Sequence, residues 1–345
     1  MRGAIVGYGV IASTGHVPAF QAMRGHAIVA VADPVEARRQ AAARQIPGVQ
    51  TFATHQELLA RAGALGLEFV DIATPPCDHL EIVLGAAARG LHVLCEKPIT
   101  VSLEQARTML RAARDSGVTI FPCHNYKHAP VVKAIREVIR SGRIGDVRSA
   151  TLSTYRTTNA RGTADWNANW RRMRRYSGGG VLMDHGSHTC YLTFMFFGAP
   201  PRSVAARTYQ MDRGFDTEDN ACVVLTFEDG FAQMHLSWTA GVRKVICVLQ
   251  GSEGAVVVDE DRAQIFSRDS VEHRTIVSRF DDASHTSWFT SMFEQFVGEV
   301  ERGSHLTDEL KESYWCMATI EAIYRSAARQ CCEVEVDTDL SFLDR

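Results

Sequence analysis

The chain has 345 residues, of which 46% are hydrophobic and 22% charged, the composition of a globular protein in water. A formal net charge of -3 and the lack of an apolar run of about 18 residues argue against nucleic acid and membranes as partners. The length exceeds one ordinary hydrophobic core, so two domains are expected.

The first third of the chain alternates short apolar runs with helical patterns. Continuous apolar strands that alternate with helices are typical of βαβ units in a parallel sheet covered on both faces. The helix predicted over 103–116 has a start signal, because Ser102 can cap it and Gln105 occupies the capping-box position. The predicted strands cover residues 3–6, 27–32, 69–73, 92–95 and 118–121, and a further helix covers 79–89.

The first predicted strand runs into a Gly-x-Gly-x-x-Ala motif. Gly7 permits a tight turn, Gly9 lets the backbone approach a pyrophosphate, and Ala12 lets the following helix pack close to the strand. The second strand leads into Asp33, 21 residues after Ala12, where a carboxylate accepts hydrogen bonds from ribose hydroxyls. The motif therefore predicts a dinucleotide site that includes Gly7, Tyr8, Gly9, Val10, Ile11, Ala12 and Asp33.

Asp33 also bears on the choice of cofactor. A carboxylate at this position repels a 2′-phosphate, which favours NAD over NADP. Arg38 and Arg39 follow closely and could restore NADP binding, but we expect them on the outer face of a helix.

The predicted strand 92–95 is followed by Glu96-Lys97-Pro98. Proline disfavours a helical conformation at the preceding residue, so Lys97 is held extended at the carboxyl edge of the sheet, where ligands of open α/β sheets bind. Thr74-Pro75 follows the neighbouring strand at the same edge, and His79 opens the next helix. Taken alone, Lys97 is most simply interpreted as a solvated loop residue. Together with Thr74-Pro75 and His79 it indicates a site that faces a nicotinamide and its substrate.

From about residue 146 the pattern changes to strands with polar and apolar alternation, which indicates an antiparallel sheet. Predicted strands cover 221–227, 231–237 and 245–249, and long helices follow near 288–302 and 308–329. The expected fold class is an α/β N-terminal Rossmann domain with a parallel doubly wound sheet, plus a C-terminal α+β domain with a large, mainly antiparallel sheet. We expect residues 1–122 to bind the dinucleotide and residues 123–345 to bind substrate and form oligomer contacts. The last helices of the second domain could pack against the first domain.

The nine cysteines are scattered, odd in number and without a Cys-x-x-Cys pair. This spacing argues against a disulfide framework and against structural zinc, so reduced thiols and no metal site are expected. Met1 and Arg2 lead directly into a short apolar run and glycines rather than into a signal region. A cytoplasmic location is therefore expected.

Asp184 and His188 lie four residues apart after the triple glycine 178–180. On a helix this spacing puts both side chains on one face, and the glycines can lead into such a helix with unusual backbone angles. Histidine exchanges protons most readily near neutral pH, and a carboxylate one turn away can orient a hydroxyl or raise the pKa of the histidine. A capped helix start also explains the spacing, so the residues alone leave both interpretations open.

Together these segments resemble the glucose-fructose oxidoreductase / inositol dehydrogenase (Gfo/Idh/MocA) family over essentially the whole chain. The Glu-Lys-Pro and the Gly-Gly-Gly…Asp-x-Gly-x-His elements, in this order and spacing, are the specific parts of the resemblance. It rests on the motif at 7–12, Asp33, Thr74-Pro75 with His79, Glu96-Lys97-Pro98, Asn169-Trp170-Arg171, Gly178-Gly179-Gly180, Asp184-x-Gly186-x-His188 and the closing helix around 321–326.

The resemblance implies a catalytic set of Lys97, Asp184 and His188. In the implied reaction a nicotinamide exchanges a hydride with a carbinol carbon while His188 takes the hydroxyl proton, Lys97 hydrogen-bonds the same oxygen and Asp184 holds a neighbouring hydroxyl. Cofactor contacts are implied for Thr74, Pro75, His79, Glu96 and Lys97. Substrate contacts are implied for Lys97, Asn125, Tyr126, Lys127, Trp170, Arg171, Asp184 and His188.

Several features depart from the family pattern or add to it. His185 stands where an apolar residue is common, and we expect it to line its helix rather than contact substrate. Asn125-Tyr126-Lys127 replaces an arginine that often follows an aromatic residue, so Lys127 or His124 could hold a substrate oxygen. The basic segment 171–175 is either a solvated surface or a grip on an anionic substrate group. Trp166, Trp170 and Trp238 are candidates for stacking on a sugar ring, with core packing as the alternative.

The sequence thus predicts an NAD-dependent dehydrogenase of a sugar, cyclitol or sugar derivative. The alternatives are an NADPH-dependent reductase that works in the opposite direction and a non-catalytic dinucleotide-binding regulatory protein. Retention of Lys97, Asp184 and His188 argues against the regulatory protein. The expected small-molecule partner is a polyol or sugar-like substrate. The resemblance also implies a dimer or tetramer of the chain, formed through the open face of the antiparallel sheet.

Overall fold

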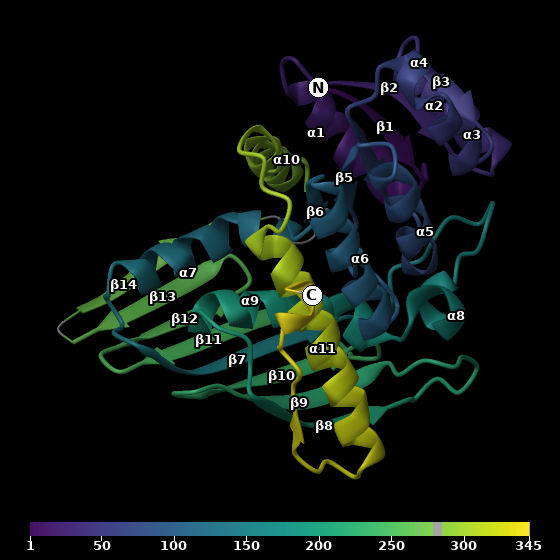
Figure 1. Ribbon diagram of the computed structural model, residues 1–345. Helices are drawn as coiled ribbons and strands as arrows, with labels where there is room; N and C mark the ends of the chain where they lie inside the picture. Colours follow the sequence, from purple (N-terminus) through teal and green to yellow (C-terminus); the bar gives the residue numbers. More distant parts are fainter. Residues whose placement is uncertain (269, 279–284, 345) are drawn as a thin grey trace.

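The computed structural model of the chain describes residues 1–268, 270–278 and 285–344. Two β-sheets, one in each half of the chain, are joined by helices packed on and between them (Figure 1). The parallel sheet in the first half and the mostly antiparallel sheet in the second confirm the expected fold class.

The first sheet is entirely parallel and has the order β3-β2-β1-β4-β5-β6. Its central strands are buried on both faces, as their continuous apolar sequences require. The predicted strands are confirmed within two residues at each end, while the short polar β3 was missed because it has no apolar run. The strands are β1 (Arg2–Val6), β2 (Ala27–Ala32), β3 (Gln50–Phe52), β4 (Phe69–Ile72), β5 (His92–Cys95) and β6 (Ile120–Pro122).

Helices cover both faces of this sheet. The Ser102 hydroxyl accepts the Gln105 N–H at 3.3 Å and starts α6 as predicted, whereas α5 starts three residues earlier than predicted, at Pro76. A single π-helical turn, Ala12–His16, precedes α1. The helices are α1 (Val17–Ala22), α2 (Glu36–Gln45), α3 (His55–Ala60), α4 (Ala62–Leu65), α5 (Pro76–Ala87) and α6 (Leu103–Ser116).

The second sheet has nine strands in the order β14-β13-β12-β11-β7-β10-β9-β8-β15. Neighbouring strands are antiparallel except β7 and β10, which run parallel. The strands are β7 (Val147–Tyr155), β8 (Ser203–Tyr209), β9 (Asn220–Thr226), β10 (Phe231–Ser237), β11 (Lys244–Gly251), β12 (Ala255–Asp259), β13 (Arg262–Ser267), β14 (Ser270–Thr275) and β15 (Val334–Glu335).

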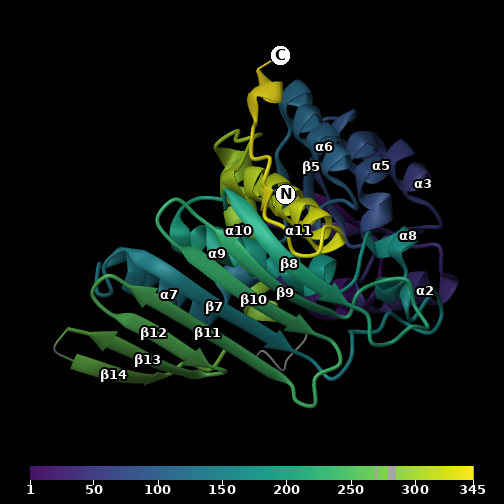
Figure 2. The same cartoon turned by 90° about the horizontal axis from the view of Figure 1, so that it is seen from below.

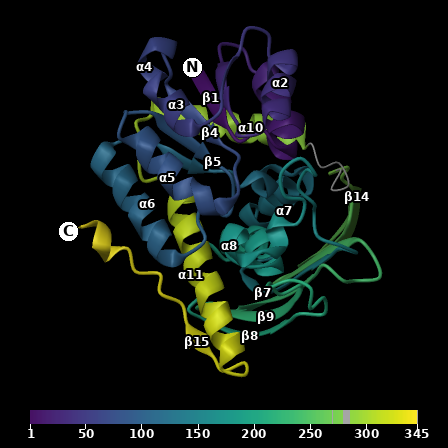
Figure 3. The ribbon, with the colours of Figure 1, turned by 90° about the vertical axis from the view of Figure 1, so that its right-hand side faces the viewer.

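The second half also contains α7 (Pro130–Arg140), α8 (Arg174–Ser177), α9 (Ser187–Phe197), α10 (Thr286–Glu301) and α11 (Asp308–Ala328). Helix α11 packs on both α6 and β8, and α10 packs on α1, where the Phe20 and Phe293 rings stack 4.1 Å apart. The end of the chain runs alongside α6 (Figure 3), where Arg114 donates to the Leu343 carbonyl at 2.8 Å. The last helices therefore tie the two halves together.

One face of the nine-stranded sheet is covered by helices that include α9 and α11, and the other face is turned to the viewer in Figure 2. Along β10 the side chains from Phe231 to Leu236 alternate between exposed and buried, so that Phe231 lies on the uncovered face, diagonal to Val224 of β9. Tyr209 of β8 lies on the same face. Among the described helices, none is both long and apolar enough to cross a bilayer.

Candidate active site

A cavity of about 400 Å³ opens where the strand order of the parallel sheet reverses, between β1 and β4. Ligands of open α/β sheets bind at such a switch point, beyond the carboxyl ends of the strands. The loops after β1, β4 and β5 form one wall, and residues from the second half, including Asp184 and His188, form the other. The cavity therefore joins the predicted dinucleotide site to the predicted catalytic residues.

The glycine turn after β1 is built for close approach. Gly7 has a φ of +91°, and a Cβ atom there would lie 2.8 Å from the Ala73 carbonyl. Gly9 lines the cavity, and a Cβ atom added to it would meet nothing within 4 Å, so its open side is space for a ligand. Asp33 closes the turn, because its Oδ2 accepts the Tyr8 N–H at 2.7 Å and its Oδ1 accepts the Val35 N–H at 2.8 Å. This cradle fits a dinucleotide.

The other residues predicted to bind cofactor divide into two groups. Val10, Ile11, Thr74, Pro75, Glu96 and Lys97 line the cavity. Tyr8, Ala12 and His79 are buried behind it. The imidazole of His79 bonds the carbonyls of Ile99 and Thr74 at 3.2 and 2.9 Å, and so it holds the loops in place instead of facing the cavity.

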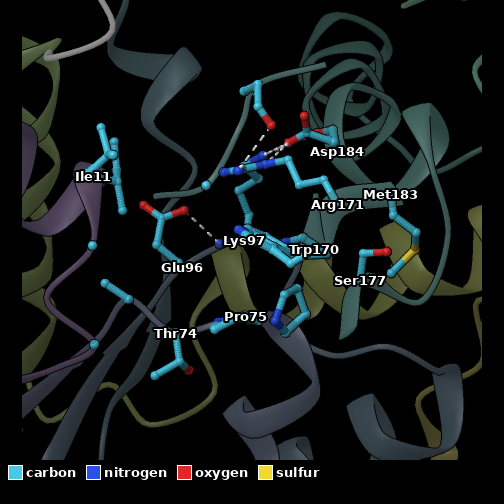
Figure 4. A pocket seen from close by; sticks show the side chains of 18 of the residues that line it. Ile11, Thr74, Pro75, Glu96, Lys97, Trp170, Arg171, Ser177, Met183 and Asp184 are labelled. Carbon is cyan, nitrogen blue, oxygen red and sulfur yellow. Dashed lines mark hydrogen bonds and ion pairs between the residues drawn. The ribbon is translucent and has the colours of Figure 1, made fainter. Parts of the chain in front are cut away.

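Lys97 and Asp184 form an ion pair at the far end of the cavity. The Lys97 ammonium donates to Asp184 Oδ1 at 2.8 Å and to the Asp184 carbonyl at 3.2 Å. Figure 4 shows Lys97, Arg171 and Asp184 converging, with Thr74 and Pro75 on the opposite side. Burial alone would raise the pKa of Asp184, but Lys97, His185 and Arg171 hold that pKa well below its usual range. Asp184 is therefore ionised near neutral pH.

The triple glycine is required by packing beneath the Asp184 turn, Leu182–Gly186. Of the three, Gly178 has a positive φ, +77°, so the predicted unusual backbone angles apply to one glycine. A Cβ atom at Gly179 would lie 2.0 Å from the Tyr324 hydroxyl, and one at Gly180 would lie 1.8 Å from the Glu218 carbonyl. Oε1 of Glu218 accepts the N–H groups of Gly180 and Leu182 at 2.9 and 3.1 Å and thereby orients the turn that carries Asp184.

His188 stands at the start of α9, directly after this π-helical turn, a distortion that is frequent at functional sites. Its Nδ1 shares a hydrogen bond of 2.5 Å with the Tyr191 hydroxyl, and its ring stacks on Tyr126 with centroids 3.9 Å apart. Burial lowers the pKa of His188 well below its usual range, and the Lys97 charge lowers it further. The imidazole is therefore neutral near neutral pH and can accept a proton.

The remaining predicted substrate residues separate in the structure. Asn125 and Tyr126 line the cavity. Lys127 forms an ion pair with Glu312, outside the cavity lining, and His124 bonds the Ser313 hydroxyl at 2.8 Å. His185, expected merely to line its helix, faces the cavity, and burial lowers its pKa to about 4.

The arginines of the basic segment 171–175 neither all lie at the surface nor all face one binding site. Arg171 lines the cavity, with its Nε 3.8 Å from Asp184 Oδ1 and its guanidinium 4.2 Å from the centre of the Trp170 ring. Arg172 is 4% exposed and pairs with the buried Asp219 at 3.2 Å. Arg174 and Arg175 are exposed at the surface. The segment turns through a 3₁₀ turn and the short α8, so each guanidinium faces a different direction.

The three candidate tryptophans also divide. Trp166 and Trp170 line the cavity and are available for stacking. Trp238 is 1% exposed and lies in the core, which corrects its candidacy for a sugar contact. Its position at the end of β10 gave no sign of burial.

A buried cluster that the sequence did not indicate lies beneath Lys97. The imidazole of His16 bridges Asp71 Oδ2 at 2.8 Å and Glu96 Oε1 at 3.0 Å, and Glu96 in turn accepts the Lys97 N–H at 3.1 Å. Burial would lower the pKa of His16, but the two carboxylates raise it to about 10. With both ring nitrogens bonded to carboxylates, His16 fits a protonated imidazole that fixes Glu96 better than a metal ligand.

Arg38 corrects another expectation, since it does not lie on the outer face of α2. It lines the cavity beside Asp33, with Nη1 3.6 Å from Asp33 Oδ2. Arg39 instead donates to the carbonyls of Asp33 and Pro34 at 2.7 and 3.0 Å. Arg38 and Arg39 differ because their side chains leave α2 in different directions. The apolar residues of α2 show almost no preferred face, so the sequence could not predict these directions.

Two family models match the chain. One, described as "Oxidoreductase family, NAD-binding Rossmann fold", matches residues 1–124, and the other, "GFO/IDH/MocA C-terminal domain", matches residues 132–257. The chain is 30% identical over 335 residues to "D-xylose 1-dehydrogenase (NADP(+)) 2" of Haloferax volcanii, covering 95% of this chain and 97% of the relative.

Solved structures show the same fold. Levoglucosan dehydrogenase in complex with NADH and levoglucosan superposes with a TM-score of 0.87 at 20% identity and covers 98% of this chain and 100% of its own. GenD2 from gentamicin A biosynthesis in complex with NAD superposes with a TM-score of 0.83 at 26% identity and covers 98% of this chain and 96% of its own.

Proposed function

The chain belongs to the Gfo/Idh/MocA family of NAD(P)-dependent oxidoreductases, and from this premise we propose that it oxidises a hydroxyl-bearing carbon of a sugar, cyclitol or sugar derivative. The observation that carries the proposal is the convergence of Lys97, Asp184 and His188 on one cavity that also contains the glycine turn. The relatives' names support a sugar-like substrate, since they contain D-xylose and levoglucosan. A regulatory protein has no need of these three side chains.

In the proposed reaction, His188 is the general base. When its Nδ1–H donates to the Tyr191 hydroxyl, Nε2 is left as the acceptor for the substrate proton. Lys97 hydrogen-bonds the same substrate oxygen and stabilises negative charge as it develops there. Asp184 orients the Lys97 ammonium and accepts a hydrogen bond from a neighbouring substrate hydroxyl. The bound nicotinamide supplies the hydride acceptor, or the donor in the reverse direction.

The proposed cofactor is NAD. Asp33 supports it, because a carboxylate beside the ribose repels a 2′-phosphate. An NADP(H)-dependent reductase is the second candidate. Arg38 at the cavity wall and the NADP(+) in the name of the Haloferax volcanii relative favour it. The Gly7–Gly9 turn serves either cofactor.

A screen of both cofactors against polyols, sugars and sugar acids tests this proposal. We expect reduction of NAD, measured at 340 nm, with at least one sugar-like alcohol, and slower reduction of NADP. A clear preference for NADP would favour the reductase. Tight binding of NADH without turnover of any compound in either direction would contradict the enzymatic proposal and favour the regulatory protein.

We also propose that the chain self-associates through the uncovered face of the nine-stranded sheet, as a dimer or tetramer. Tyr209, Val224 and Phe231 support this, because they lie on adjacent strands of that face and are 60%, 40% and 53% exposed. Light scattering of the purified chain should give twice or four times the monomer mass. A monomer mass at micromolar concentration would contradict the proposal.

A further inference from the structure

Arg38 connects the two halves of the chain across the rim of the cavity. Besides facing Asp33, its guanidinium donates to Asp165 through Nε at 3.2 Å and through Nη2 at 2.7 Å, and to the Thr163 hydroxyl. Asp165 and Thr163 belong to the loop between β7 and the 3₁₀ turn Trp170–Arg172, in the second half of the chain. The Nε/Nη2 edge of the guanidinium, one of its two edges that can bind an anion with paired hydrogen bonds, is therefore occupied by a residue outside the Rossmann domain.

The two carboxylates beside Arg38 differ in what holds them. Asp33 is 1% exposed and bonds two backbone N–H groups, so it is fixed within the turn. Asp165 is 37% exposed and is held through its contacts with the loop and with Arg38, and its hydrogen bonds to Arg38 and Thr163 lower its pKa. Water can replace Arg38 at Asp165, whereas Asp33 has no such freedom. Asp165 is thus the partner that Arg38 can exchange.

A 2′-phosphate, if present on the adenosine ribose, belongs beside the acidic residue that ends the second strand. Arginine is the side chain suited to bind phosphate, with two parallel hydrogen bonds from one guanidinium edge. To bind the phosphate through its Nε/Nη2 edge, Arg38 has to release Asp165. The Asp165 carboxylate then lies close to the new negative charge. An unphosphorylated ribose leaves the Arg38–Asp165 pair intact.

We propose that Asp165 is a specificity-determining residue, which disfavours 2′-phosphorylated dinucleotides by occupying Arg38 from the second half of the chain. The inference rests on the proposed function in one respect, that a nicotinamide dinucleotide binds this cavity. It adds that cofactor choice depends on the 156–169 loop as well as on the Rossmann domain. Trp166 of the same loop lines the cavity.

Equilibrium binding of NADH and NADPH to the purified chain tests this, with transfer of tryptophan fluorescence to the reduced nicotinamide as the readout. In Asp165→Asn the Kd for NADPH should fall about threefold to tenfold, the scale of one charged contact, while the Kd for NADH changes less than twofold. Asp165→Ala should act in the same direction, which guards against an effect of the amide itself. Thermal melting checks that each variant is folded.

Two further variants separate this role from a general effect of charge. Arg38→Ala combined with Asp165→Asn should show no gain in NADPH affinity, because the freed guanidinium is absent. Glu36→Gln is the control for charge, since it removes one negative charge from α2, the helix that carries Arg38, at a residue that bonds Gln40. An unchanged NADPH-to-NADH ratio in both Asp165 variants, or an equal gain in Glu36→Gln, overturns the inference. If neither dinucleotide binds the unaltered chain, the proposed function fails as well.

Discussion

His188→Ala should lower kcat for alcohol oxidation by about 10²–10⁴-fold, the usual cost of losing a general base. The substitution removes the proposed acceptor of the substrate proton and leaves the glycine turn and Asp33 untouched. NADH affinity should therefore stay within about twofold, which separates a chemical role from unfolding. Steady-state kinetics with the best compound from the substrate screen, together with NADH titration, measure both quantities.

Lys97→Ala should lower kcat on the same scale, because it removes the cation that we propose to contact the substrate oxygen. The double variant should lose much less than the product of the two single losses, since both residues act on one transition state. Lys97 also stabilises the ionised Asp184 carboxylate, which without it keeps Arg171 as a more distant ion-pair partner at 3.8 Å. Lys97→Arg is a useful comparison, because it keeps the charge and alters the geometry.

The pH dependence distinguishes a base from a merely structural residue. Oxidation needs the neutral imidazole, so the rate is full above the pKa of His188 and falls as the pH drops through it. Burial and the Lys97 charge hold this pKa well below the usual range, so the loss should appear only in acid. In Lys97→Ala the acid limb should move to higher pH, because one cause of the lowered pKa is gone. Near-normal turnover in His188→Ala would refute the role, and His185, which also lines the cavity, would become the candidate.

Arg172→Ala should lower the free energy of unfolding by about 3–5 kcal/mol, the usual result of leaving one partner of a buried ion pair uncompensated. Its guanidinium contacts Asp219, which is 0% exposed, and lies over the rings of Phe215 and Trp238 at 4.6 and 5.7 Å. The variant leaves the Asp219 carboxylate buried with its hydrogen bonds to backbone and Asn220 but without its cation. Urea denaturation measures the loss.

Two neighbours in the same segment serve as controls. Arg175→Ala removes an exposed guanidinium and should change stability by less than about 0.5 kcal/mol. Arg171→Ala should leave stability nearly unchanged and raise KM, because Arg171 lines the cavity beside Asp184. A stable Arg172→Ala protein with a raised KM would contradict this division and return Arg172 to substrate binding.

Local patterns determined most of the fold. Apolar runs located β2, β4 and β5 because strands buried on both faces need apolar side chains throughout, and the alternation in β10 marked a sheet with one covered face. Ser102 and Gln105 located the start of α6 because a capping hydroxyl acts on backbone three residues away. The sequence did not locate the exact ends of elements, nor β3, whose three residues form a sheet edge with no apolar run of their own. In the second sheet it located β9, β10 and β11 but gave no ranges for β7, β8 or β12 to β15.

The sequence by itself also pointed to many of the residues that line the candidate site. The glycine turn, Glu96-Lys97-Pro98 and the Asp184–His188 spacing are local features, and each stands at an element end that the strand and helix patterns locate. Only the tertiary structure decided how these residues combine with others. It paired Lys97 with Asp184, put Arg172 in the core and Arg171 at the cavity, and brought Asp165 to Arg38 across 127 positions of the chain. Contacts between residues so far apart in the chain depend on how the helices and sheets pack. The direction in which one arginine side chain leaves its helix cannot be predicted from the local sequence pattern.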